Sequence, residues 1–215
     1  MIRREAERHE HAYHLSWFYD TRAWLVNETR VVARLMVDEN LSDTKEIIEK
    51  VTAQNLFQYP TEREQKSITR ACCRRLLALS EDEDVRASLI NLAAHGSLEQ
   101  LAQVNLYAMM CDNRVVWDFM TCVIAPKFSL FDLSLRKSEI VTFIEGLRAQ
   151  DDRVATWSDA TCNKVRQVLV NCIEGAGLYS RKTEALRPPL LDFELERCVR
   201  ANDDAAVLPA FGITE

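Results

Sequence analysis

Hydrophobic side chains recur at intervals of three and four residues through most of this chain, which is the spacing of amphipathic helices. Near the N-terminus the pattern predicts three helices separated by polar breaks, over residues 24–37, 43–51 and 61–79. Thr61 and Glu64 have the spacing of a capping box, which predicts where the third helix starts. Three helices joined by a short turn and then a longer one predict a helix-turn-helix-like unit.

The middle of the chain is the most apolar part and is expected to form a helical core. Ser80 with Glu83 is expected to start a helix that ends at Gly96. Residues 98–125 carry most of the aromatic and aliphatic mass, and polar residues near 112–114 indicate a junction between two helices. Only 5 glycines and 5 prolines are present, which argues against a sandwich or barrel rich in tight turns.

The last third of the chain predicts one more amphipathic helix and then a small β-hairpin. The helix spans residues 159–174, and its polar face consists of Asn163, Lys164, Gln167 and Asn171. The hairpin spans residues 178–187, with Arg181 and Lys182 at its tip. This order is typical of a winged helix, and a surface β-turn packed on the core is an equally good interpretation. After Ala201 the chain is expected to pack loosely or fray.

We therefore expect a mainly α-helical protein with three consecutive regions. These are an N-terminal helix-turn-helix-like region (1–79), an acidic helical bundle core (80–155) and a C-terminal winged-helix-like region with a small β-hairpin and a tail (156–215). The first holds 13 Lys/Arg and 12 Asp/Glu (net +1), the second 7 and 12 (net −5), and the third 7 and 9 (net −2). The net charge of the whole chain is −6, which counts against a simple basic nucleic-acid binder. Because the acidic excess lies mainly in the middle region, any nucleic-acid contact is expected in the two end regions.

The third predicted helix carries the strongest candidate binding surface. At about 100° per residue, four cations fall within an arc of roughly 80° and form a basic stripe, which consists of Arg63, Lys66, Arg70 and Arg74. Ile68 and Leu76 lie on the opposite side, so one face can anchor the helix while the other meets a polyanion such as a nucleic-acid backbone. Glu62 and Glu64 lie outside the arc and are not expected to neutralise it. An ordinary solvated charged face is the alternative interpretation.

No catalytic residue, cofactor or metal site is expected. Metal-ligand spacing is incomplete in the cluster of His9, His11 and His14, because Tyr13 stands where a zincin motif needs its second histidine. The acidic residues 81–84 are ordinary composition for the first turn of a helix. Glycine-rich phosphate-binding motifs are absent from the sequence.

The protein is expected to be cytoplasmic, without membrane contact. Its longest uncharged apolar stretch is residues 101–111, whereas about 20 residues are needed to span a bilayer. Arg3 and Arg4 are followed by acidic residues, so no signal peptide is expected. The 7 cysteines contain no C-x-x-C pair, which fits a reducing compartment.

Several short motifs occur in order along the chain. They are Tyr13-His14-Leu15-Ser16, Glu28-Thr29-Arg30-Val31-Val32-Ala33, Asn55-Leu56-Phe57-Gln58, Arg74-Arg75-Leu76, Trp117-Asp118-Phe119, Trp157-Ser158-Asp159-Ala160-Thr161 and Glu174-Gly175-Ala176-Gly177-Leu178. In order and spacing they resemble the BrxA family of bacteriophage exclusion (BREX) defence systems. The resemblance implies a small helical protein encoded beside a methyltransferase, an ATPase and a phosphatase-like protein. It implies DNA binding through helix-turn-helix or winged-helix elements, or a likeness to a helical RNA-binding antitermination factor, and assigns no catalytic residues.

One hypothesis and two alternatives follow. The hypothesis is a non-enzymatic component of a BREX-type phage-defence system that binds double-stranded DNA through the basic helix and the wing. The residues assigned to these contacts are Arg63, Lys66, Arg70, Arg74, Arg181 and Lys182. In the first alternative the acidic middle region is a docking face for other BREX proteins. In the second the protein binds RNA, although most aromatic residues lie in apolar stripes and not where bases could stack on them.

Replacing Lys66, Arg70 and Arg74 together with alanine is predicted to flatten the slope of log affinity against log salt concentration by about 3, because each phosphate contact contributes about 0.9. Four contacts correspond to a slope of about −3 to −4. Duplex binding at several salt concentrations measures both values. An unchanged slope in the triple variant would remove the stripe from the interface.

Overall fold

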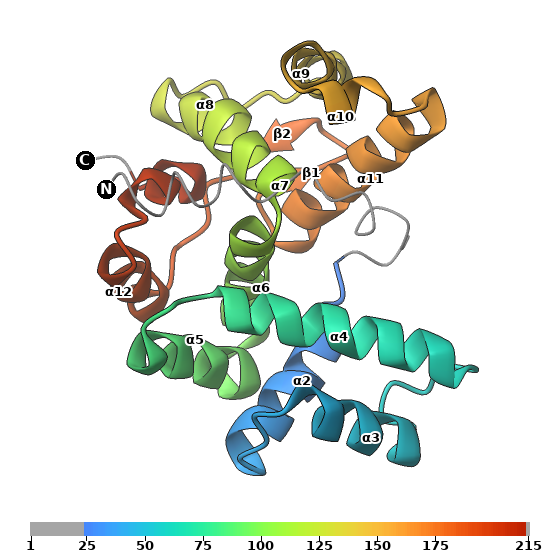
Figure 1. Ribbon diagram of the computed structural model, residues 1–215. Helices are drawn as coiled ribbons and strands as arrows, with labels where there is room; N and C mark the ends of the chain where they lie inside the picture. The colour runs from blue at the N-terminus through green and yellow to red at the C-terminus, as the bar shows by residue number, and fades with distance from the viewer. Residues whose placement is uncertain (1–23, 214–215) are drawn as a thin grey trace. The chain divides into compact units, whose positions relative to one another are not determined.

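The computed structural model describes residues 24–213, which are mainly helical with one small two-stranded antiparallel sheet (Figure 1). The chain divides into two compact units, each built from separate stretches of sequence. The helical unit comprises residues 25–112 and 192–202; the hairpin unit comprises Trp24, 113–191 and 203–213 of the described residues. The expected helical bundle with a small hairpin is confirmed. The three regions defined by charge remain a prediction.

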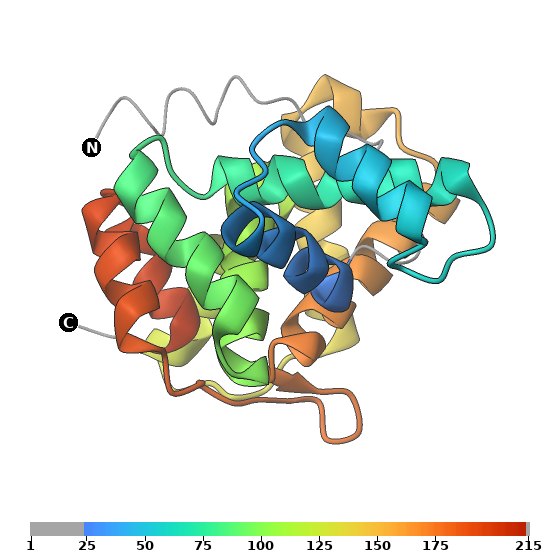
Figure 2. The ribbon, with the colours of Figure 1, turned by 90° about the horizontal axis from the view of Figure 1, so that it is seen from below.

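Six helices of the described chain form the helical unit. In order they are α2 (Val26–Asp38), α3 (Thr44–Gln54), α4 (Glu62–Ala78), α5 (Glu83–His95), α6 (Leu98–Asp112) and α12 (Phe193–Ala201). The first three correspond to the helices that periodicity predicts. α6 is buried nearly all round and contacts α2, α4 and α5, so it forms the centre of this unit. α3 lies against α4 (Figure 2).

Side chains cap the starts of α4, α5 and α6. Thr61 caps α4 by accepting a hydrogen bond from the N–H of the third helical residue. Ser97 and Gln100 exchange hydrogen bonds in a capping box at the start of α6. The expectation that Ser80 caps α5 is wrong: Asp82 is the N-cap, because its carboxylate accepts hydrogen bonds from two N–H groups of the first turn.

The end of α12 is locked into the helical unit by a buried polar cluster. The Asn202 amide donates to the carbonyl of Leu79 at 2.8 Å and to the hydroxyl of Tyr107 at 2.9 Å. Its carbonyl oxygen accepts a hydrogen bond of 2.6 Å from the Ser80 hydroxyl. One carboxamide therefore satisfies three polar groups that come from distant parts of the sequence.

The hairpin unit contains short helices around a hairpin. Its elements are α7 (Arg114–Phe119), the π-helical turn η2 (Met120–Ile124), α8 (Ala125–Ser129), α9 (Lys137–Gln150), α10 (Asp152–Ala155), α11 (Asp159–Gly175), β1 (Tyr179–Ser180), β2 (Ala185–Leu186) and the 3-10 segment η3 (Ala205–Phe211). α9 packs against α11, and α11 contacts β1. Gly177, with φ of 76°, lets the chain turn from α11 into β1.

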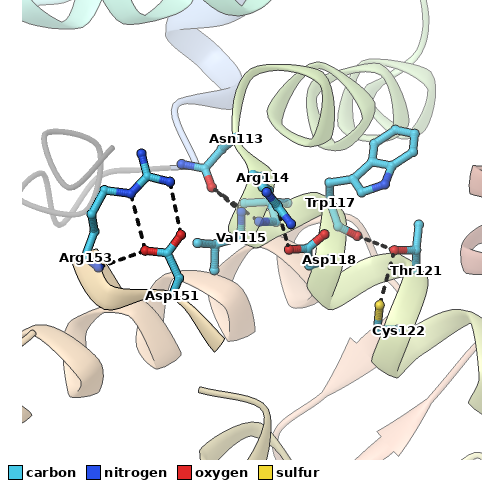
Figure 3. Close-up of polar contacts among 10 residues, drawn as sticks. Asn113, Arg114, Val115, Trp117, Asp118, Thr121, Cys122, Asp151 and Arg153 are labelled. Atoms are coloured by element: carbon cyan, nitrogen blue, oxygen red, sulfur yellow. Dashed lines mark hydrogen bonds and ion pairs between the residues drawn. The ribbon is translucent and has the colours of Figure 1, made fainter. Parts of the chain in front are cut away.

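The expected break within residues 98–125 occurs at Asn113. Its side chain caps α7 by accepting hydrogen bonds of 2.9 and 3.3 Å from two N–H groups of the first turn (Figure 3). Further along, the Thr121 hydroxyl donates to the carbonyl of Trp117 at 2.9 Å, where α7 passes into the π-helical turn. The hydroxyl competes with backbone N–H groups for this helix carbonyl, and the helix widens into the π-helical turn at the same place.

The hairpin forms where the sequence predicts it, and a third segment extends it. β1 and β2 pair antiparallel, with Tyr179 opposite Leu186. The residues just before α9 lie along the other edge of β2, because the N–H of Leu186 donates to the carbonyl of Leu133 at 2.7 Å. A second bond of 3.0 Å runs from the N–H of Leu135 to the carbonyl of Glu184. These bonds hold the start of α9 beside the hairpin.

The expectation that the chain frays after Ala201 is wrong. Residues 205–211 form η3, which contacts α8 and η2. Val207, Leu208 and Phe211 are buried there, so an apolar run near the end of the chain completes the core of the hairpin unit.

Replacing Asn202 with alanine is expected to lower the free energy of unfolding by about 2–4 kcal/mol, because it leaves several buried polar groups without their partner. Chemical denaturation measures the change. The same substitution at Asn91, an exposed residue of α5, removes a carboxamide without a buried cluster and is expected to change stability by less than about 0.5 kcal/mol. Equal effects at the two positions would contradict the role given to Asn202.

Candidate nucleic-acid interface

α4 is held in the helical unit by one side and turns its basic side to solvent. Its apolar side, which includes Ile68 and Leu76, is buried in a helix that contacts α2, α3 and α6. The basic stripe lies on the other side, where three of its members are exposed and Lys66 is half-buried. The amphipathic arrangement predicted from the sequence is present, whereas nucleic-acid contact stays a prediction.

Carboxylates of the helical unit engage two of the four cations in the stripe. The Lys66 Nζ atom lies 2.7 Å from Glu62, and this hydrogen bond lowers the pKa of the Glu62 carboxyl. Arg74 makes a two-point contact with Asp112, with Nε–Oδ1 at 2.7 Å and Nη2–Oδ2 at 3.1 Å. The expectation that Glu62 leaves the stripe unneutralised is wrong, because side chains four residues apart on a helix are neighbours.

Arg63 and Arg70 are the members of the stripe best placed to meet an external anion. Both side chains are exposed, and neither forms an ion pair with any carboxylate within residues 24–213. Two helical turns separate them, a rise of about 10 Å along the helix axis. The stripe therefore offers two available cations and two that would have to exchange a carboxylate for a phosphate.

A groove of about 630 Å³ in the hairpin unit gathers a second set of cations. They come from three elements: Lys137 from α9, Lys164 and Arg166 from α11, and Arg181 from the hairpin. Glu184 is the carboxylate in the lining of this groove. The lining of the groove is therefore positive, although the chain as a whole carries a net charge of −6.

α11 is oriented by its cap and by its apolar side. Ser158 accepts a hydrogen bond of 3.2 Å from the N–H of Thr161 and so caps the helix that the sequence predicts from residue 159. Val165 and Leu169 are buried, so the opposite face is turned outward. That face places Asn163 and Gln167 in the lining of the groove, beside the cations.

The tip of the hairpin presents Arg181 and Lys182, as the sequence predicts. The Arg181 Nε atom lies 2.7 Å from Glu174, and its guanidinium also donates to Asn171, so α11 steadies it beside the groove. Lys182 is exposed and forms no ion pair with the residues that the structure describes. Both belong to the hairpin unit, whereas the stripe belongs to the helical unit, so we treat the two as separate surfaces.

Sequence reasoning missed two cations of the groove. Lys137 is the first residue of α9, and the sequence pattern assigns it to no helix face. Arg166 lies three residues after Asn163 on α11, a spacing that puts both on neighbouring positions of one face. The position of Arg166 could be predicted from its spacing in the sequence. The position of Lys137 at the groove depends on the contact between the start of α9 and the hairpin, which the sequence does not show.

A buried lysine anchors the end of α9 that carries Lys137. The Lys127 Nζ atom lies 2.7 Å from Asp132 and 2.6 Å from Glu139, and the Glu139 carboxylate also accepts a hydrogen bond from the N–H of Arg136. The hydrogen bond from Lys127 lowers the pKa of Asp132. Burial alone raises the pKa of Glu139, but the bonds from Lys127 and Arg136 outweigh it and the net shift is downward.

Other candidate chemistry finds little support within the described residues. Cys72 is fully buried, and burial raises the pKa of its thiol to about 12, as expected for an unreactive core cysteine. No group of three His, Cys, Asp or Glu within residues 24–213 could hold a metal ion. The cluster of His9, His11 and His14 lies outside the described residues. Between residues 24 and 213, none of the helices has the length and apolar character needed to cross a membrane.

Comparison with known proteins gives matches over most of the chain. The family model BrxA matches residues 18–203. The BREX protein BrxA of Bacillus cereus (strain H3081.97) is 29% identical over 161 residues, which covers 74% of this chain and 78% of that protein. The crystal structure of an uncharacterized protein from Magnetospirillum magneticum has the same fold, with a TM-score of 0.75 at 19% identity, over 93% of this chain and 97% of the other.

The Lys127 cluster predicts a specific pH dependence. The pKa values of Asp132 and Glu139 are lower in the folded protein, so their stabilisation is present above the pKa of an unfolded carboxyl, near 4, and is lost as the pH falls through the folded values. Lys127→Met is expected to melt at a lower temperature than the parent at pH 7, and the difference is expected to close towards pH 2–3.

Thermal unfolding monitored by circular dichroism across this pH range measures the difference. The control is Lys182→Met, the same substitution at an exposed lysine, which is expected to leave the melting temperature unchanged at every pH. A difference between Lys127→Met and the parent that persists at pH 2 would contradict the ionic anchor.

Proposed function

Because the chain belongs to the BrxA family, and is therefore a component of a BREX phage-defence system, we propose that it acts by binding duplex DNA through the groove of the hairpin unit. In this proposal it is a binding component and not an enzyme. One observation carries the proposal: four cations from α9, α11 and the hairpin line one groove around the polar face of α11. Helix faces of this kind enter the major groove while neighbouring cations contact phosphates.

The order of elements in the hairpin unit supports the winged-helix interpretation. A strand-like segment before α9 is followed by α9, then α11, then β1 and β2, and the segment hydrogen bonds to β2. In that interpretation α11 is the recognition helix, the start of α9 meets the DNA backbone, and residues 181–184 are the wing. Lys137, Arg181 and Lys182 are then phosphate contacts on either side of α11.

The basic stripe of α4 is proposed as a second, weaker contact. α3 and α4 pack together as in a helix-turn-helix-like unit, and Arg63 with Arg70 faces solvent. Lys66 and Arg74 must first leave Glu62 and Asp112. The Lys66–Glu62 pair is exposed and contributes only about 0–1 kcal/mol, so a phosphate can replace Glu62 at low salt. The Asp112 side chain is only 6% exposed, so separating it from Arg74 costs more.

A second function, contact with other BREX proteins, is favoured by one feature of the hairpin unit. The turn after α8 exposes Leu130 and Phe131, with 78% and 84% of their surface accessible. Exposed apolar side chains of this size are typical of protein contacts. Partners that stay bound after nuclease treatment, with no duplex binding at low salt, would favour this function over DNA binding.

Replacing Lys137, Arg166 and Arg181 together with alanine is expected to flatten the slope of log duplex affinity against log salt concentration by about 3. The control removes the same charges elsewhere, in Lys45→Ala, Arg197→Ala and Arg200→Ala, all at exposed positions outside both proposed surfaces, and is expected to keep the parent slope. Fluorescence anisotropy with a labelled duplex measures the slope. If only substitutions in the basic stripe changed it, the interface would move to α4.

A further inference from the structure

The outward face of α11 carries a stripe of uncharged residues along the groove. Ala160, Asn163, Gln167 and Val170 follow one another at spacings of three, four and three residues, and all four line the groove. Asn163 and Gln167 are exposed, and neither carboxamide forms a hydrogen bond within residues 24–213. The cations lie around this stripe and not within it.

Carboxamides and cations select different parts of a duplex. A cation suits a phosphate, or the two acceptors of guanine in the major groove. A carboxamide offers one donor and one acceptor side by side, which matches the N6 amino group and the N7 atom of adenine. Small apolar side chains such as Ala160 and Val170 suit the methyl group of thymine, on the other side of the same base pair.

We propose that Asn163 and Gln167 read A·T base pairs in the major groove of duplex DNA, while the surrounding cations hold the backbone. This inference rests on the proposed function, because it assigns specificity to the same groove. The two amides are four residues apart on α11, about 6 Å along the helix axis, so they can address neighbouring base pairs. Duplex RNA does not offer this contact, because its major groove is too deep and narrow for a side chain to read.

The experiment compares duplexes that differ by single atoms in the major groove. In one A·T-rich duplex every adenine is replaced by 7-deazaadenine, which removes the N7 acceptor and keeps base pairing and the minor groove. The full chain is expected to bind it about 5- to 150-fold more weakly than the parent duplex. The matched G·C-rich pair, with and without 7-deazaguanine, is expected to show no difference.

Variants connect the effect to the two amides. The double variant Asn163→Ala with Gln167→Ala is expected to bind the adenine and 7-deazaadenine duplexes equally, with the same salt slope as the parent. Both positions are exposed, so the fold is expected to persist, and circular dichroism checks it. The control is Gln150→Ala, an exposed glutamine at the end of α9 outside the groove, which is expected to keep the parent's discrimination.

The outcomes separate this inference from DNA binding itself. Equal binding of both A·T-rich duplexes by the parent, with a salt slope that depends on Lys137, Arg166 and Arg181, would overturn the reading role and leave the proposed function standing. Discrimination that persists in the double variant would also overturn it, because other residues would then read the base. Tighter binding to an RNA duplex of the same sequence, or no duplex binding at low salt, would overturn both.

Discussion

Two backbone hydrogen bonds beside β2 hold the groove together. They join Leu186 to Leu133 and Leu135 to Glu184, and so keep the start of α9 next to the hairpin. α11 leads into β1 through Gly177 and also packs on α9, so α9, α11 and the hairpin are all connected to one another. Lys137 and Arg181 are far apart in the sequence but line one groove as a result. Without these hydrogen bonds, Lys137 and Arg181 would not be held at the same groove.

The chain is acidic as a whole, but its two candidate binding surfaces are rich in basic residues. The chain carries a net charge of −6, yet both candidate surfaces present clusters of Lys and Arg. Several of these cations are held by acidic neighbours, as in the pairs Lys66–Glu62 and Arg181–Glu174. All four side chains are at least 40% exposed, so each pair stabilises the fold only weakly and can exchange with another anion. An acidic protein can therefore keep a salt-sensitive affinity for a polyanion.

Features that depend on neighbouring residues could be predicted from the sequence. The helices over residues 26–78, the Thr61 cap and the hairpin follow from periodicity, capping chemistry and turn composition. The partners of Asn202, the segment that extends the hairpin and the groove contact of Lys137 join residues far apart in the chain, so no local pattern encodes them. Asp112, at the end of α6, pairs with Arg74 for the same reason.

The threading of the chain has a consequence for its synthesis. The backbone passes between the two units at residues 24/25, 112/113, 191/192 and 202/203. Residues 25–112 leave the ribosome before the rest of the helical unit, but the surface of α5 that receives α12 and the polar groups that bind Asn202 stay uncovered until residues 193–202 have emerged. The hairpin unit likewise waits for residues 205–211. Neither unit can therefore be completed before residues 193–211 have been synthesised, and a message truncated before residue 193 yields no finished half.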